Sequence, residues 1–422
     1  MTPRLASSSI LSGFDRARWC LAADALAAGV AVFVPWSTTL TEIFVVLWLV
    51  AFLPTLFLPV ADFGGPRNVL RIPAGFLPIV LCALAAIGML WAFDVSWTER
   101  LGGFAKFPRL MLIALLLVHF ARSERGVWVL YGFLAATTLL LLASLALATL
   151  PGLPWRGKEF GVPVNDYIRQ STCFMVCVFG LLGATVERAR AGKWWHAIGL
   201  IALAGLFLGD ILFVVSSRTS LFVAPILLLM LGWRAFRSKG VLAAVVLGIV
   251  VSGAGWLSSP YLRERLSTSM QEWRDYRASD TANSTGLRAE FLKKSVAFIA
   301  AAPIIGHGTG SIPQQFRNAA VGESGAAAAA SKNPHNQIFA VAIQLGAVGT
   351  VVLLAMWAAH FMLFTGSGLV AWIGMTVVAD NFLSSLFNSH LFDTGQGWLY
   401  IFGVGVAGGM VLRGRKSVPA SP

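Results

Sequence analysis

Three basic side chains lie in the polar breaks between long apolar segments of this sequence: Arg218 and His335 at the borders of such breaks, and Arg288 inside the longest break. An ionisable residue at such a border is a candidate functional residue, because a bilayer tolerates few charges that serve no purpose. A guanidinium keeps its charge and binds pairs of oxygen atoms, which suits a phosphate group. A neutral imidazole accepts a proton or orients a hydroxyl group. Two guanidinium groups and an imidazole together indicate chemistry in which a phosphate group is neutralised and a hydroxyl group is activated.

Arg218 belongs to the run Ser216-Ser217-Arg218-Thr219-Ser220, the one strongly polar interruption between residues 197 and 233. That stretch is too long for a single span of about 20 residues, so we predict a tight hairpin at the run. The hairpin is short, and we therefore expect the guanidinium to point into the mouth of the bundle. The alternative is an arginine that only reaches back to the interface. Asp210 is too far along the helix to pair with it directly, at roughly 12 Å of rise.

Arg288 follows Ser284 and Thr285, either of which can cap a helix that stops before Pro303. This places Arg288 in the first turn. A cation is unfavourable there for helix stability, but it fits if the helix N-terminus and the guanidinium both face an anion. The alternative is an exposed arginine with no role.

His335 follows Asn333 and Pro334, which read as the cap and first residue of a transmembrane helix. His335 would then lie in the first turn, where the positive helix end favours the neutral imidazole. A merely capping or interfacial histidine is the alternative. We interpret the earlier run Gly306-His307-Gly308-Thr309-Gly310 as a turn, with His307 structural, because no Walker lysine follows it.

The elements that must position these residues are membrane helices. The 422 residues are 57% hydrophobic and 12% charged, about half the charged fraction of a soluble domain. An all-α, polytopic transmembrane bundle follows. We predict about twelve spans, over residues 21–36, 41–61, 73–93, 104–121, 127–149, 169–187, 195–215, 219–233, 240–257, 336–358, 367–388 and 395–413.

We attribute the net charge of +13 to basic residues that set the orientation of the chain in the membrane, and not to binding of a nucleic acid. The basic residues recur in clusters between spans, and the clusters alternate correctly for one cytoplasmic side. That side receives the N-terminal leader, the loops with Arg67, Arg122, Arg188 and Arg234, and the tail with Arg413. The hairpin at Arg218 and one long loop then lie outside, which in a bacterium is the periplasm.

The chain therefore divides into a bundle of about nine spans over residues 1–257, a large loop over 258–335, and three further spans with a tail over 336–422. The loop begins with an expected amphipathic helix from Pro260 to Asp280, lying on the membrane surface. A lid and a substrate guide are both compatible with that helix. No Asp-x-Asp pair or Cys/His set suited to a metal stands on the outer side, so we expect no metal or other cofactor.

The ordered motifs resemble those of the O-antigen ligase family, within a wider group that includes O-antigen polymerases and bacterial oligosaccharyltransferases. They are Ser216-Ser217-Arg218-Thr219, Gly286-Leu287-Arg288, Pro303 to Gly310, His335-Asn336 and Gln344 to Gly349. Two positions depart from the family pattern. Phe291 or Leu292 stands where a tryptophan is common, and Gln344 stands where a glutamate is common.

The resemblance implies a GT-C-like glycosyltransferase of the bacterial inner membrane. It would move O-antigen polysaccharide from undecaprenyl diphosphate to lipid A-core at the periplasmic face, by an inverting displacement without metal. Arg218 and Arg288 would bind the diphosphate, and His335 would activate or orient the acceptor hydroxyl. An O-antigen polymerase, an oligosaccharyltransferase and a transporter of lipid-linked glycans are the alternatives.

Overall fold

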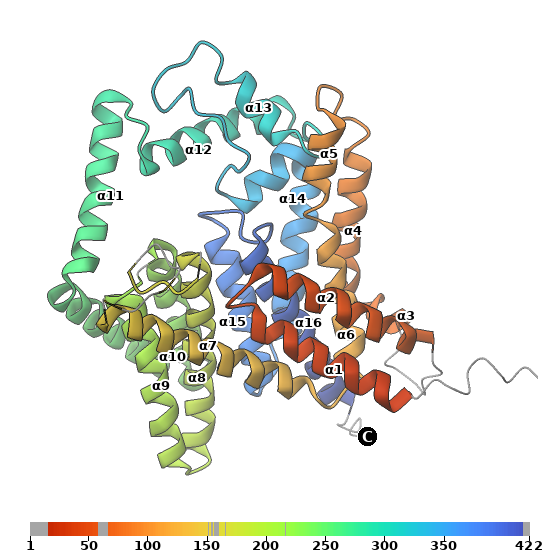
Figure 1. The fold of residues 1–422 in the computed structure, drawn as a ribbon, viewed down its shortest axis with the longest axis vertical. Helices are drawn as coiled ribbons and strands as arrows, with labels where there is room; N and C mark the ends of the chain where they lie inside the picture. Colours follow the sequence, from red (N-terminus) through yellow and green to blue (C-terminus); the bar gives the residue numbers. More distant parts are fainter. Residues whose placement is uncertain are drawn as a thin grey trace, which may run out of the picture.

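The computed structural model describes residues 16–57, 66–150, 152, 155, 160–164, 166–215 and 217–416, and in this part every regular element is helical (Figure 1). The elements are α1 (Arg16–Phe33), α2 (Thr38–Phe52), η1 (Leu53–Phe57), α3 (Pro66–Val69), α4 (Pro73–Gly88), α5 (Trp97–Phe104), η2 (Pro108–Met111), α6 (Leu112–Phe120), α7 (Gly126–Thr149), α8 (Tyr167–Arg190), α9 (Trp194–Phe213), α10 (Arg218–Ser258), α11 (Pro260–Ser279), α12 (Ser284–Ala301), α13 (Ile312–Asn318), α14 (Gln337–Leu363), α15 (Leu369–Ser384) and α16 (Thr394–Lys416).

The helices confirm a multi-pass membrane protein. Eight helical stretches of the described chain are long and apolar enough to cross a bilayer, and α4 and α15 are shorter apolar helices. Each of the twelve predicted segments overlaps one or more helices, and residues 58–61 of the second segment lie outside the described residues. The count of twelve crossings stays a prediction, because α1 carries three charged residues and several helices are short.

The long helix α10 is two helices joined by a break. Phe236 and Arg237 have non-helical backbone angles, and Arg237 has a φ of 55°. A Cβ atom on Gly232 would lie 2.3 Å from the carbonyl oxygen of Gly240, so the two halves touch close to the break. Gly248 also faces Leu228, which means that the halves run antiparallel. The predicted spans 219–233 and 240–257 therefore form a hairpin, as the cluster of basic residues between them indicated.

Basic residues from loops assigned to one side, and from the tail, lie at one end of the bundle, while residues 1–15 of the leader lie outside the described residues. Arg413 donates to the carbonyl oxygen of Ser123 at 3.2 Å, and Arg234 donates to that of Gly366 at 2.8 Å. Arg190 donates to the carbonyl oxygen of Ala235. In Figure 1 the C-terminal end of α16 lies at this end, and α12 and α13 lie at the other. We call these the basic end and the loop end.

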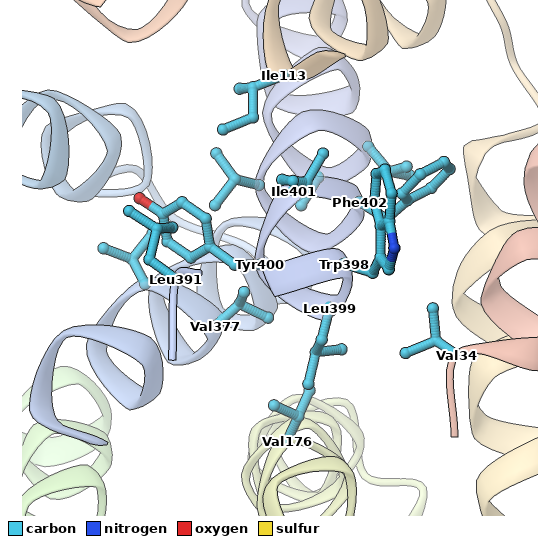
Figure 2. Close-up of a cluster of buried hydrophobic side chains, with 14 of the residues drawn as sticks. Val34, Ile113, Val176, Val377, Leu391, Trp398, Leu399, Tyr400, Ile401 and Phe402 are labelled. Atoms are coloured by element: carbon cyan, nitrogen blue, oxygen red, sulfur yellow. The ribbon is translucent and has the colours of Figure 1, made fainter. Parts of the chain in front are cut away.

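The start of α16 is buried among helices from both halves of the chain (Figure 2). Figure 2 shows Leu399 pointing toward Val176 of α8, while Trp398 and Phe402 occupy another side of α16. Tyr400 and Leu391 are fully buried on a third side. Because lipid is as apolar as these side chains, such close packing is what holds membrane helices together. Leu391 thereby anchors the segment between α15 and α16 at the loop end.

The large loop contains three helices, and its first two form a tight corner. Tyr276 of α11 donates to Glu290 of α12 at 2.7 Å, and this hydrogen bond raises the pKa of Tyr276 to about 12. The cap of α12 is Asn283, which accepts from the backbone of Gly286, and not Ser284 or Thr285 as expected. Helix α12 ends before Pro303 as predicted. Arg288 therefore falls at the start of the second turn, not in the first.

Candidate functional site at the loop end

His335 lies in a turn immediately before α14, which corrects its expected position inside the helix. The cap of α14 is Asn336, whose side chain accepts from the backbone of Phe339, and the helix begins at Gln337. His335 has a φ of 54°, a left-handed conformation that few residues other than glycine adopt. Asn333 does not cap the helix but accepts a hydrogen bond from the backbone N–H of His335 at 2.9 Å. This hydrogen bond holds the backbone of His335 in its turn.

A chain of amides connects this imidazole with a carboxylate. The Nδ1 atom of His335 lies 3.1 Å from Oδ1 of Asn388, and Nδ2 of Asn388 donates to Asp393 at 2.9 Å. Asn333 also donates to Oδ1 of Asn388, and Ser389 donates to Asn333. A carboxylate only accepts hydrogen bonds, so it fixes which face of the Asn388 amide points toward His335. Oδ1 of Asn388 then accepts the proton on Nδ1, and Nε2 keeps its lone pair.

Helix α12 reaches this imidazole through Phe291. The two rings are stacked, with centroids 5.8 Å apart and planes 10° apart. Phe291 is buried, whereas the neighbouring Leu292 is half exposed. Of the two residues at the position where the family often has tryptophan, Phe291 is thus the aromatic contact of the site.

Arg288 lies one helical turn before Phe291 and acts on both histidines of the region. Burial lowers the pKa of His335, the charge of Arg288 lowers it further, and the hydrogen bond with Asn388 partly opposes this. Burial also lowers the pKa of His390 to about 4, and Arg288 and His335 add to that shift. Both imidazoles are therefore neutral at pH 7, beside a permanent positive charge.

Arg218 is the first residue of α10, directly after the predicted hairpin, and it contacts the loop helices. Its guanidinium lies 3.6 Å from Glu272 of α11 and 3.4 Å from the hydroxyl of Thr285 in α12. Thr285 precedes Arg288 by one turn of the same helix. The structure thus brings Arg218, Arg288 and His335 to the same end of the bundle, around the first half of α12.

The glycine run is a structural connection, as predicted. The backbone N–H groups of His307 and Gly308 donate to the carbonyl oxygens of Ile343 and Gln344 in α14. The side chain of His307 is held by the carbonyl oxygen of Phe298 at 2.8 Å. The amide oxygen of Gln344 accepts from the backbone of Gly310, so a neutral side chain serves at the position where the family often has glutamate.

Sequence reasoning missed the whole segment between α15 and α16. Asn388, His390 and Asp393 lie within six residues of one another, and polar residues at that density before a hydrophobic helix were the signal available. His390 is 1% exposed, and neither of its ring nitrogens has a hydrogen-bond partner within the described residues. Asp210, predicted to lie too far from Arg218 for a direct pair, accepts a hydrogen bond from Ser144 of α7 at 2.7 Å.

The described residues hold no group of three or more His, Cys, Asp or Glu side chains arranged for a metal ion. The cations of the site are guanidinium groups, and its titratable groups are imidazoles and carboxylates.

The chain is a multi-pass helical membrane protein. Arginines and a neutral histidine form a polar site under the helical loop at one end of its bundle. Residues 201–354, from α9 into α14, match the family model described as O-antigen ligase, and this match supports membership of that family. Its members are membrane glycosyltransferase-like enzymes. A comparison with curated proteins gave no match. The matched range contains Arg218, Arg288 and His335, whereas Asn388 and Asp393 lie beyond it.

Proposed function

We propose that this protein is an O-antigen ligase, a GT-C-like inverting glycosyltransferase of the bacterial inner membrane. It transfers polysaccharide from undecaprenyl diphosphate to lipid A-core at the periplasmic face. The observation that supports this most is the gathering of Arg218, Arg288 and neutral His335 at the loop end of a chain of this family. The arginine clusters at the basic end favour a periplasmic loop end.

In this proposal the acceptor hydroxyl attacks the anomeric carbon of the lipid-linked sugar. The new C–O bond forms as the bond between that carbon and the phosphate oxygen breaks. The diphosphate leaves with the electron pair, and Arg218 and Arg288 stabilise the negative charge that develops on it. The configuration inverts because there is one displacement and no covalent enzyme intermediate.

His335 takes the proton of the attacking hydroxyl on Nε2. This assignment rests on the hydrogen bond of Nδ1 with Asn388, which leaves the lone pair on the other nitrogen. While Asp393 is ionised, its carboxylate holds the amide of Asn388 in this orientation. Burial raises the pKa of Asp393 to about 6, so most of the carboxyl group is ionised at pH 7.

The titration of His335 should depend on Arg288. Because burial and Arg288 lower the pKa of His335, its basic form persists as the pH falls below 6.5, and protonation occurs only in more acidic solution. Replacing Arg288 with glutamine removes a positive charge, so the titration should move to higher pH. Asp393, through Asn388, and the neutral His390 also face this imidazole. NMR of histidine-labelled protein, assigned with His335→Gln, measures the midpoint. Equal midpoints in wild type and Arg288→Gln would contradict the arrangement.

Asn388 should act as a positioning residue for the tautomer of His335. In Asn388→Ala the Nδ1 proton loses its acceptor, and we expect kcat to fall about tenfold with the donor KM little changed. The pKa of His335 should also fall further, because its hydrogen bond with Asn388 raises that pKa. Asn318→Ala is the matched control, since Asn318 is exposed and, among the described residues, its side chain bonds only with Gln314. An unchanged kcat together with an unchanged histidine titration would remove Asn388 from the mechanism.

Reconstitution tests the reaction itself. Purified protein, lipid-linked O antigen and lipid A-core are combined in the presence of EDTA, and polysaccharide attached to the core is measured. Product formation supports a metal-independent ligase, and no product with or without divalent ions contradicts the proposal. Gene deletion separates the nearest alternative: loss of a ligase leaves bare core, whereas loss of a polymerase leaves core with one repeat unit.

A further inference from the structure

A polar pocket at the loop end lies where three helices begin. It has a volume of about 480 Å³ and is formed by the starts of α2, α8 and α16. Asp393 lines the pocket and also bonds Asn388, so this carboxylate separates the pocket from His335. None of the three predicted site residues lines it.

Arg169 is the unexplained group of this pocket. Its side chain is 5% exposed, and it makes no hydrogen bond or ion pair with any part of the chain that the structure describes. The Cβ atom that Gly395 lacks would lie 2.4 Å from Cδ of Arg169, so α16 leaves room for this side chain. A buried guanidinium without a partner is costly unless an anion joins it.

The helix starts add to the positive potential of the pocket. The three helices are 15, 24 and 23 residues long, and each presents its positive end here. The N-terminus of a helix favours phosphate and carboxylate groups. Arg169 and the helix starts together indicate that the pocket takes an anionic group.

The other side chains of the pocket suit hydroxyl groups. Asp166 and Asp393 can accept hydrogen bonds from a ligand, and Gln396, 3.5 Å from Asp166, offers an amide. Trp36 presents an aromatic surface, and its position is fixed because its indole donates to the carbonyl oxygen of Ala136 at 3.0 Å. Two carboxylates disfavour a ligand that is anionic throughout.

We infer that this pocket is a saccharide subsite for a sugar ring that carries one carboxylate or phosphate group. Arg169 binds the acidic group, Asp166 and Asp393 accept hydroxyl hydrogens, and Trp36 covers one face of the ring. As an extension that rests on the proposed function, the ring belongs to the acceptor glycan, because the charged group of the donor is already assigned to Arg218 and Arg288.

Direct binding to the purified full-length chain tests the subsite without any transfer reaction. The probes are glucuronate, glucose 6-phosphate, glucose and inorganic phosphate, measured by ligand-observed NMR. The acidic sugars should bind about tenfold more tightly than glucose and than inorganic phosphate, because a charged pair adds to the hydroxyl contacts. Arg169→Gln should abolish this preference and leave glucose unaffected. Arg277→Gln, which changes an exposed arginine of α11, should preserve the preference.

Three results would overturn the inference: acidic sugars binding no better than glucose, inorganic phosphate binding as well as glucose 6-phosphate, or a preference that survives in Arg169→Gln. If Arg169→Gln does not fold, Arg169→Lys keeps the charge but loses the paired geometry, and it should weaken the preference. The proposed function fails separately, if reconstituted protein forms no product while the acidic sugars still bind.

Discussion

Replacing His335 with asparagine should reduce transfer of polysaccharide to lipid A-core by about a thousandfold, the middle of the range for a general base. Asparagine tolerates the left-handed backbone conformation that His335 adopts, so the turn before α14 should persist. An amide can orient a hydroxyl but cannot take its proton at neutral pH. This variant therefore tests proton transfer and not merely the presence of a polar side chain.

The measurement is the initial rate of product formation by purified protein at saturating donor and acceptor. His335→Ala should lose at least as much activity, with an added destabilisation of about 1 kcal/mol from the backbone. His196→Ala is the control, because His196 is exposed and lies near the start of α9 at the basic end. A rate for His335→Asn within tenfold of wild type would show that His335 orients the hydroxyl and does not act as a base.

The membrane architecture could be predicted from hydropathy because each span is a local property of the sequence. A segment of about 20 apolar residues crosses a bilayer whatever its neighbours are, and clusters of arginine mark its cytoplasmic end. The break in α10 at Phe236 and Arg237 and the hairpin before Arg218 followed from this reasoning. The ends of helices were less predictable, since Asn283 and Asn336 compete with neighbouring residues that cap equally well.

The site was only half predictable because its second half depends on contacts between distant segments. Arg218 and His335 stand at a membrane border and Arg288 lies in the adjoining loop, and the charge or titratable ring of each is visible in the sequence. Asn388 carries neither, and its importance arises from lying between His335 and Asp393, more than 50 residues from the first of them. Arg169 is the first residue of a predicted span, and the sequence gives no sign of the pocket around it.

Arg218→Ala and Arg288→Ala should each lower the transfer rate by about a hundredfold to a thousandfold, the loss typical of removing one group that stabilises a developing negative charge. The loss should appear in kcat, because the charge on the diphosphate grows as the sugar–phosphate bond breaks. Arg218→Lys and Arg288→Lys should fall in between, since lysine keeps the charge but not the paired hydrogen bonds. Arg277→Ala should be nearly neutral, because Arg277 is exposed on α11.

The double variant tests whether the two arginines act on one diphosphate. Residues that stabilise the same group are not independent, so the combined loss should be smaller than the product of the single losses. Arg218 also bonds Thr285 and pairs with Glu272, so Glu272→Gln serves as a second control for loosening of the loop corner. This variant should keep most of its kcat if the diphosphate, and not Glu272, is the functional partner of Arg218. Losses confined to the donor KM would show that the arginines bind the donor without assisting the departure of the diphosphate.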